Sequence, residues 1–299
     1  MERNNRGNLS LDTKTQIILL WLAVAFYAAS SVLFAWGWVR NRSREAGEQR
    51  NDGAKEFLWA VRLAFLGLLP HTSALLLRWL ETGHGPYMHR YEVYSSDVWV
   101  VVLVYLLVQL RWPRLRFTGI MVLPSSFLLI GMAVLSSPEI QPLPPTFGTY
   151  WLVVHILFAK LAYGCLVIGT ALAVFYLIKD RALRKGKSSA FLTKLPGLPT
   201  LHEQSYQFIA FGFIMLAIMI AAGAIWANKA WGRYWGWDPV ETWSFISWLL
   251  YGIYLHLVRT YGWTGRRPAW LAILAVLILI FALFGIGLVY ESLHSPYVR

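Results

Sequence analysis

The chain has 299 residues, of which 57% are hydrophobic and only 14% are charged, and its formal net charge is +12. Soluble domains carry about 25% charged residues, and apolar runs long enough to cross a bilayer recur along the chain, so we exclude an ordinary soluble protein and predict an all-α integral membrane protein. The single cysteine excludes a disulfide framework, a CxxC redox pair and a covalent CxxCH heme site within the chain.

The apolar segments predict a polytopic bundle of about eight transmembrane helices, formed by residues 1–299 as a single membrane domain. A long polar stretch precedes the first segment, so we interpret that segment as a retained span and not as a cleaved signal peptide. The third segment is short and the fifth is long. The predicted spans are Gln16–Val39, Phe57–Trp79, Asp97–Leu110, Phe117–Leu135, Tyr150–Ile178, Tyr206–Ala227, Val240–Val258 and Ala269–Tyr290.

The positions of Lys and Arg predict the orientation of the chain. Four alternate loops hold 17 of them, whereas the two termini and the three remaining loops hold 7. Because basic loops stay in the cytoplasm, both termini and the loop between the sixth and seventh spans are expected to be extracytoplasmic. The membrane is then a bacterial cytoplasmic (inner) membrane or its equivalent, and the basic charge indicates topology in a lipid bilayer with no nucleic-acid partner. The basic loops are residues 40–56, 111–116, 179–205 and 259–268.

The second span and the loop after it contain several polar side chains. His71 lies within the span, and an ionisable group at membrane depth is usually functional. The competing interpretation is a neutral histidine that forms a hydrogen bond with another helix. Arg78 lies two turns further along and is expected to extend to the outer surface. His84, His89 and Glu92 are expected to be solvated in the loop.

Two further histidines flank the later spans on the outer side. His155 lies five residues into the fifth span, and His294 lies just past the eighth. Two imidazoles from these positions could be the axial ligands of one heme iron. The alternative is that they are unrelated histidines at the membrane interface. His256 lies late in the seventh span.

Tryptophan is concentrated between Trp226 and Trp248, which hold six of the sixteen in the chain. Rigid aromatic faces separated by glycines suit a flat, largely apolar ligand. The alternative is an interfacial anchor, because tryptophan is common where membrane meets water. Asp238, Pro239 and Glu241 also match a capping box that begins the next helix. The candidate ligand-binding residues are Trp231, Gly232, Trp235, Gly236, Trp237, Asp238, Pro239 and Glu241.

The run WANKAWGRYWGWDPVETW resembles the tryptophan-rich "WWD" signature of the heme-handling proteins of cytochrome c maturation, and is most similar to the CcsA (ResC) branch. The resemblance implies that residues 228–239 are an extracytoplasmic platform for non-covalently bound heme b. It also implies that His155 and His294 are the external iron ligands, and that His71 and His256 are an intramembrane pair. The spans do not place that pair at one depth. His71 lies about 20 Å from the inner end of its span, whereas His256 lies about 20 Å or more from the outer end of its own.

The resemblance implies that heme is presented on the outer face for covalent attachment to the CxxCH of an apocytochrome c. A membrane protein of the CcsB (ResB) type is the expected partner, and the two together would form a holocytochrome c synthase. Whether this chain catalyses attachment by itself stays open. Two other functions stay open as well: CcmC-type delivery of heme to a chaperone without attachment, and transport of an unrelated apolar solute.

Overall fold

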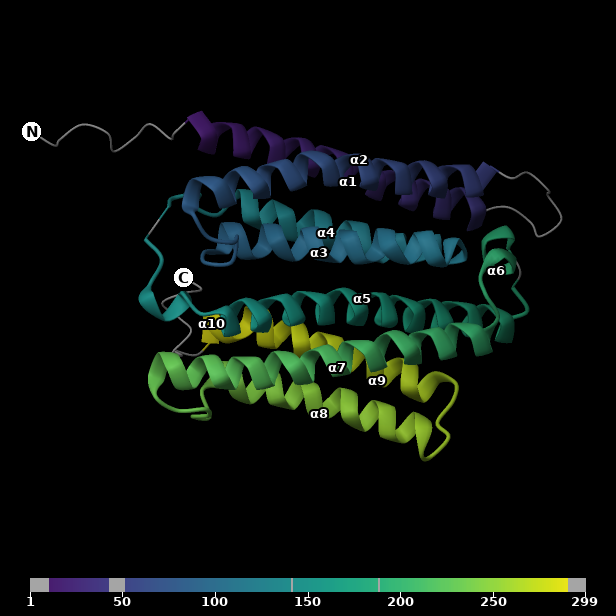
Figure 1. Ribbon diagram of the computed structural model, residues 1–299. Helices are drawn as coiled ribbons and strands as arrows, with labels where there is room; N and C mark the ends of the chain where they lie inside the picture. The colour runs from purple at the N-terminus through teal and green to yellow at the C-terminus, as the bar shows by residue number, and fades with distance from the viewer. Residues whose placement is uncertain (1–10, 43–51, 141, 188, 290–299) are drawn as a thin grey trace, which may run out of the picture.

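The computed structural model describes residues 11–42, 52–140, 142–187 and 189–289, and every regular element within these ranges is a helix (Figure 1). This confirms the prediction of an all-α polytopic bundle. The elements are α1 (Leu11–Arg42), α2 (Asp52–Thr82), α3 (Arg90–Arg111), η1 (Pro113–Thr118), α4 (Gly119–Val134), η2 (Pro145–Phe147), α5 (Tyr150–Arg184), α6 (Ala190–Lys194), α7 (Leu198–Trp231), α8 (Pro239–Arg259), α9 (Arg266–Ile280), the π-helical η3 (Phe281–Gly285) and α10 (Ile286–Val289).

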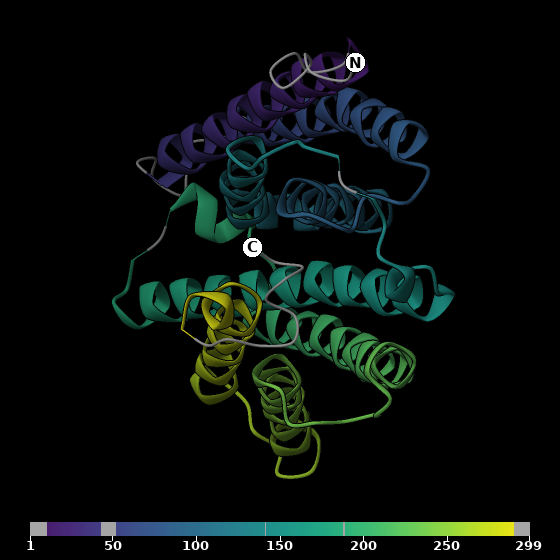
Figure 2. The same cartoon turned by 90° about the vertical axis from the view of Figure 1, so that its left-hand side faces the viewer.

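The helices form two groups that lie one above the other in both views (Figures 1 and 2). Helices α1 to α4 form the first group, and α5 and α7 to α10 form the second. The contact between α3 and α5 is the main junction between the groups. The loop between α7 and α8, residues 232–238, lies at one end of the bundle, which we call the Trp-loop end.

Seven helical segments of the described chain are long and apolar enough to cross a membrane, so the protein is an integral membrane protein. They correspond to the predicted spans one to six and eight. The predicted seventh span is α8, which has 21 residues but lies outside this set. Its sequence is rich in tryptophan, tyrosine and serine, which lowers its hydropathy. It nonetheless packs along α7 and α9 within the bundle (Figure 1).

The predicted start of the third span was wrong by about two turns. The predicted span begins at Asp97, but α3 begins at Arg90. Two charged residues of this region are buried and paired: Glu92 accepts a hydrogen bond from Arg78, and Asp97 accepts one from Lys160. Arg78 is therefore not a surface group, since only 1% of it is exposed. Sequence composition cannot show that a charge has a buried partner on another helix.

Helices α5 and α7 form one of the most extensive contacts of the structure, and small residues allow it. A Cβ atom added at Gly212 of α7 would lie 2.5 Å from Leu166 Cγ of α5. One further glycine of α7, Gly223, lies against His155 in the same way near the Trp-loop end. The close approach of these two helices therefore sets the position of the candidate ligand His155.

Candidate functional site

The Trp-rich loop is held between two well-defined helix ends. Helix α7 ends at Trp231, and Gly232 adopts φ 73° while its N–H donates to Asn228 O at 2.9 Å. A positive φ is favourable for glycine and strained for other residues. Helix α8 begins at Pro239 after the cap residue Asp238. These two ends make the loop a short, defined connection.

The predicted capping box at the start of α8 is confirmed. The Asp238 side chain accepts from Val240 N at 3.0 Å, and Glu241 Oε2 accepts from Asp238 N at 3.2 Å. The same Glu241 oxygen also accepts from Gly236 N at 2.8 Å. Glu241 therefore fixes the backbone on both sides of Trp237, which is a structural role that the sequence motif did not reveal.

Replacing Asp238 by Ala should lower the free energy of unfolding by about 1 kcal/mol, because the first turn of α8 loses its side-chain acceptor. Asp238→Asn should recover most of this loss, since its amide oxygen can still accept the hydrogen bond. Thermal unfolding of the purified protein in detergent measures the difference. Equal stability of Asp238→Ala and the wild type would contradict the role of the cap.

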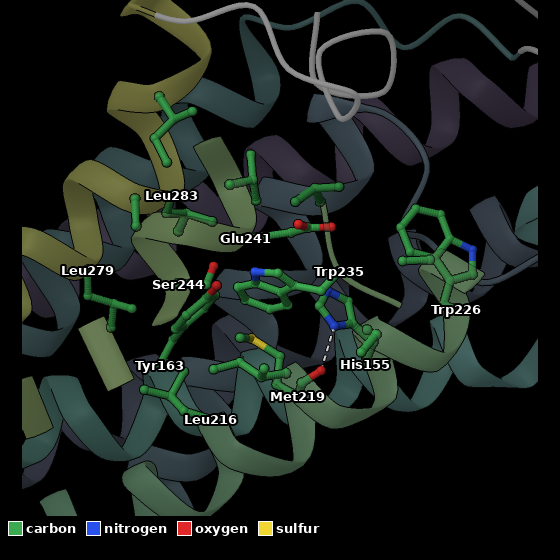
Figure 3. Close-up of a pocket in the computed structure, with 18 of the residues that line it drawn as sticks. His155, Tyr163, Leu216, Met219, Trp226, Trp235, Glu241, Ser244, Leu279 and Leu283 are labelled. Atoms are coloured by element: carbon green, nitrogen blue, oxygen red, sulfur yellow. Dashed lines mark hydrogen bonds between the residues drawn. The ribbon is translucent and has the colours of Figure 1, made fainter. Parts of the chain in front are cut away.

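A cavity of about 220 Å³ lies directly under the loop, between α5, α7, α8 and the segment from α9 to α10 (Figure 3). His155, Trp231 and Trp235 line it, together with Glu241 at the start of α8. The π-helical η3 forms part of the opposite wall, and π-helical segments occur often at functional sites. The cavity thus combines aromatic walls with an imidazole, as expected for a flat aromatic ligand.

His155 on α5 is oriented by a hydrogen bond to the main chain of α7. Its Nδ1 lies 2.8 Å from Met219 O, drawn as a dashed line in Figure 3. A carbonyl oxygen only accepts, so Nδ1 carries the proton and the lone pair of the neutral ring is on Nε2. Metal-binding histidines are commonly oriented in this way by a backbone carbonyl. Gly223 leaves room for the ring, because a Cβ there would lie 2.6 Å from Nδ1.

The tryptophans of the loop point in different directions. Trp231 and Trp235 line the cavity, whereas Trp237 does not and is 68% exposed. Trp235 and Trp237 are in edge-to-face contact, with ring centroids 5.7 Å apart. Gly236 allows the Arg233 guanidinium to pack against the loop, since a Cβ at Gly236 would lie 2.1 Å from Arg233 Cζ. Gly232, Asp238 and Pro239 shape the loop and are not among the lining residues.

Of the other predicted histidine ligands, the two in the described residues, His71 and His256, do not line this cavity. His294 lies outside the described residues. His71 on α2 is fully buried and forms hydrogen bonds with Tyr27 (3.1 Å) and Ser95 (3.0 Å). This agrees with the alternative of a histidine bonded to neighbouring helices.

His256 lies near the end of α8, beside a shallow groove that Phe213 and Trp248 also line. Helices α2 and α8 lie on opposite sides of the molecule in both views (Figures 1 and 2). His71 and His256 therefore cannot share one iron in this arrangement, because the two helix groups separate them. The different membrane depths that the sequence predicts for these two histidines led to the same conclusion.

Sequence reasoning missed several hydroxyl-bearing residues of the cavity, among them Tyr163 and Ser244. Figure 3 shows both side chains at one side of the cavity, away from His155. Their spacing was a usable signal: Tyr163 follows His155 by eight residues and Ser244 follows Glu241 by three, which are separations that share a helix face. These hydroxyls supply hydrogen-bonding groups to an otherwise apolar wall.

The fold and this site define a class of protein. It is a polytopic helical membrane protein that has an aromatic cavity under a Trp-rich loop, and an oriented histidine lines that cavity. Residues 88–294 match the family described as Cytochrome C assembly protein. The chain belongs to this family, and the predicted resemblance is confirmed.

Individual relatives cover most of the chain. A Cytochrome c biogenesis protein CcsA from Parasynechococcus marenigrum (strain WH8102) is 34% identical over 304 residues, which cover 93% of this chain and 92% of that protein. Another, from Guillardia theta, is 35% identical over 77% of this chain and 82% of that protein.

The solved structure named Cytochrome c Heme Lyase CcmF is similar in fold, with a TM-score of 0.66 at 19% identity. The match covers 99% of this chain and 50% of that one. That match concerns the fold, and membership of the family makes the chain a membrane component of cytochrome c biogenesis.

Proposed function

We propose that this chain binds heme b as a substrate in the cavity under the Trp-rich loop and presents it outside the membrane for covalent attachment to an apocytochrome c. His155 would be one axial ligand of the iron. His294 is the expected second ligand, on the basis of the sequence resemblance. The single observation that carries the proposal is the His155 imidazole, held by Met219 O with its Nε2 as the basic nitrogen, in an aromatic cavity.

The size and walls of the cavity support partial burial of a large flat ligand. At about 220 Å³ it is smaller than the roughly 300–1,000 Å³ of pockets that enclose a drug-sized ligand. A tetrapyrrole bound at His155 would therefore extend beyond the cavity and leave one edge accessible. Trp235 and Trp231 offer aromatic faces to the ring. An accessible edge is what a second reactant needs.

The chemistry that follows is addition of a cysteine S–H across each heme vinyl group. A carbon–sulfur bond forms, and the thiol hydrogen is transferred to the other vinyl carbon, so no external oxidant is consumed. The chain would contribute by holding the ring in one orientation against the incoming thiols, which is catalysis by proximity. An axial imidazole would control the iron. A membrane protein of the CcsB (ResB) type is the expected partner in this reaction.

The orientation of the site follows from the charge distribution. The Trp-loop end lies opposite the ends that carry the basic loops, so this end would face the extracytoplasmic side. Apocytochrome c would then approach the loop from outside. Heme would have to arrive at the cavity through or along the membrane domain.

The test is the absorbance spectrum of the purified full-length chain from heme-replete cells. We expect a heme spectrum that is typical of six-coordinate iron in the wild type. His155→Ala should lower heme affinity by at least about tenfold, because it removes an iron ligand. His294→Ala should lower it as well. His202→Ala is the matched control, since this histidine lies near the other end of α7 and outside the cavity.

Three results would contradict the proposal. A colourless wild-type protein would favour transport of a different apolar solute. A heme spectrum unchanged in His155→Ala would place the iron elsewhere. Heme bound at His155 that never becomes covalently attached, even with the partner and an apocytochrome c present, would favour delivery to a chaperone.

A further inference from the structure

Trp237 is the one non-glycine residue with a positive φ, 57°, in the described chain. A bulky side chain in this region is strained, and such strain is found mostly at ligand clamps and other functional sites. Its side chain is also the most exposed tryptophan side chain in the described residues. The chain therefore maintains an unfavourable backbone conformation that leaves an indole facing away from the protein.

The contacts around Trp237 show how this conformation is maintained. One oxygen of Glu241 accepts hydrogen bonds from the backbone N–H groups of Gly236 and Asp238, the two neighbours of Trp237. Asp238 is itself fixed as the cap of α8. The backbone on each side of Trp237 is thus tied to the first turn of a helix, so the indole has a defined position relative to the cavity.

A lipid anchor would not require this arrangement. Trp21, Trp36 and Trp59 are also more than half exposed, and they lie on α1 and α2 with ordinary helical backbone angles. These are adequate for contact with lipid, which imposes no single orientation. The strained backbone at Trp237 indicates a ligand that requires one particular orientation of the indole.

We propose that Trp237 is the contact residue for the polypeptide substrate, namely the segment of apocytochrome c that carries the CxxCH thiols, and that Glu241 is its positioning residue. This rests on the proposed function. Trp235 lines the cavity and contacts Trp237 edge to face, so a segment on Trp237 lies next to the edge of a ring held in the cavity. Rigid exposed tryptophans are frequent hot spots for polypeptide binding.

The first experiment replaces Trp237 with the photo-crosslinking residue p-benzoyl-phenylalanine in the full-length chain. The variant is produced in membranes together with its CcsB (ResB)-type partner and an apocytochrome c. Irradiation should yield a covalent adduct with the apocytochrome. The adduct should be lost when the CxxCH segment is deleted from the apocytochrome. Adducts with lipid only would overturn the proposal.

The second experiment separates heme binding from transfer. Trp237→Ala should retain the heme spectrum but lower the yield of holocytochrome by roughly tenfold or more, as for loss of a hot-spot residue. Trp237→Gly should show the same loss although glycine accepts the positive φ without strain, which would assign the effect to the indole. Trp21→Ala is the control and should leave the yield unchanged. An unchanged yield in both Trp237 variants would overturn the inference.

Glu241 is tested by rescue. Glu241→Ala removes the acceptor for both backbone N–H groups and should lower holocytochrome yield. Glu241→Gln should restore it, because a single amide oxygen can accept both bonds, as one carboxylate oxygen does here. Failure of Gln to rescue would show that the charge matters and that Glu241 acts in some other way. A wild-type protein without heme would instead refute the proposed function, so the two failures are distinguishable.

Discussion

Replacing Lys160 by Ala should lower the free energy of unfolding by roughly 3–5 kcal/mol, because it leaves a buried carboxylate without its cation. Lys160 on α5 donates to Asp97 on α3, and only 6% of Lys160 and 4% of Asp97 are exposed. Lys160 also donates to Val93 O at 3.4 Å. The pair lies in the main junction between the two helix groups, so the loss should affect the whole bundle.

The double variant Lys160→Met/Asp97→Asn is the informative comparison. It removes both charges while nearly preserving volume, and buried pairs replaced in this way often lose little stability. We therefore expect the double variant to be more stable than Lys160→Ala. Thermal unfolding in detergent, followed by intrinsic fluorescence, gives both values. A double variant as unstable as the single one would show that the charges are not the origin of the effect.

A surface pair provides the matched control. Arg184 forms an ion pair with Asp180 at 2.6 Å, one turn away on the same helix, but its side chain is 54% exposed. Exposed pairs of this kind contribute little, because water screens them. Arg184→Ala should therefore leave the unfolding temperature unchanged. A drop comparable to that of Lys160→Ala would contradict the importance of burial.

Replacing Gly223 by Ala should lower heme affinity roughly 10–100-fold, which is the usual cost of disturbing the group that orients a metal-binding histidine. The new Cβ would lie 2.6 Å from His155 Nδ1 and 2.9 Å from its Cε1, so the ring must move. Movement would break the hydrogen bond to Met219 O. Nε2 would move with the ring, so its position relative to the cavity would change.

The control for this prediction is Gly131→Ala on α4, where an added Cβ meets nothing within 4 Å. Alanine favours a helix more than glycine does, so this variant should be at least as stable as the wild type and bind heme normally. Heme titration of the purified proteins, followed by absorbance, measures both affinities. Equal affinity in Gly223→Ala and the wild type would show that His155 does not need its present orientation.

Local patterns were sufficient to predict the framework and one part of the site. Runs of apolar residues predicted the helices because each helix satisfies its own backbone hydrogen bonds in a bilayer. Asp238, Pro239 and Glu241 predicted the start of α8, because a capping box involves only residues near one another in the chain. The Trp-rich loop could be singled out for the same reason, whereas His155 was singled out through its pairing with the distant His294 and through the family resemblance.

Contacts between distant segments could not be read from these patterns. The sequence suggested a surface role for Arg78 and solvent exposure for Glu92, yet they form a buried pair across α2 and α3. It assigned Trp235 and Trp237 to the same ligand-binding site, whereas in the fold Trp235 lines the cavity and Trp237 is exposed outside it. It also left open a shared site for His71 and His256, which the two helix groups keep apart.

The amino-acid order therefore specified a membrane-embedded helical protein with an aromatic loop and candidate histidine ligands, since hydropathy, capping and composition act over a few turns of chain. Helix packing specified the rest: which charges neutralise one another, which imidazoles can approach one iron, and which indole is left for a second molecule. These depend on residues that are far apart in the chain, and helical periodicity carries no information about which helix face meets which neighbour.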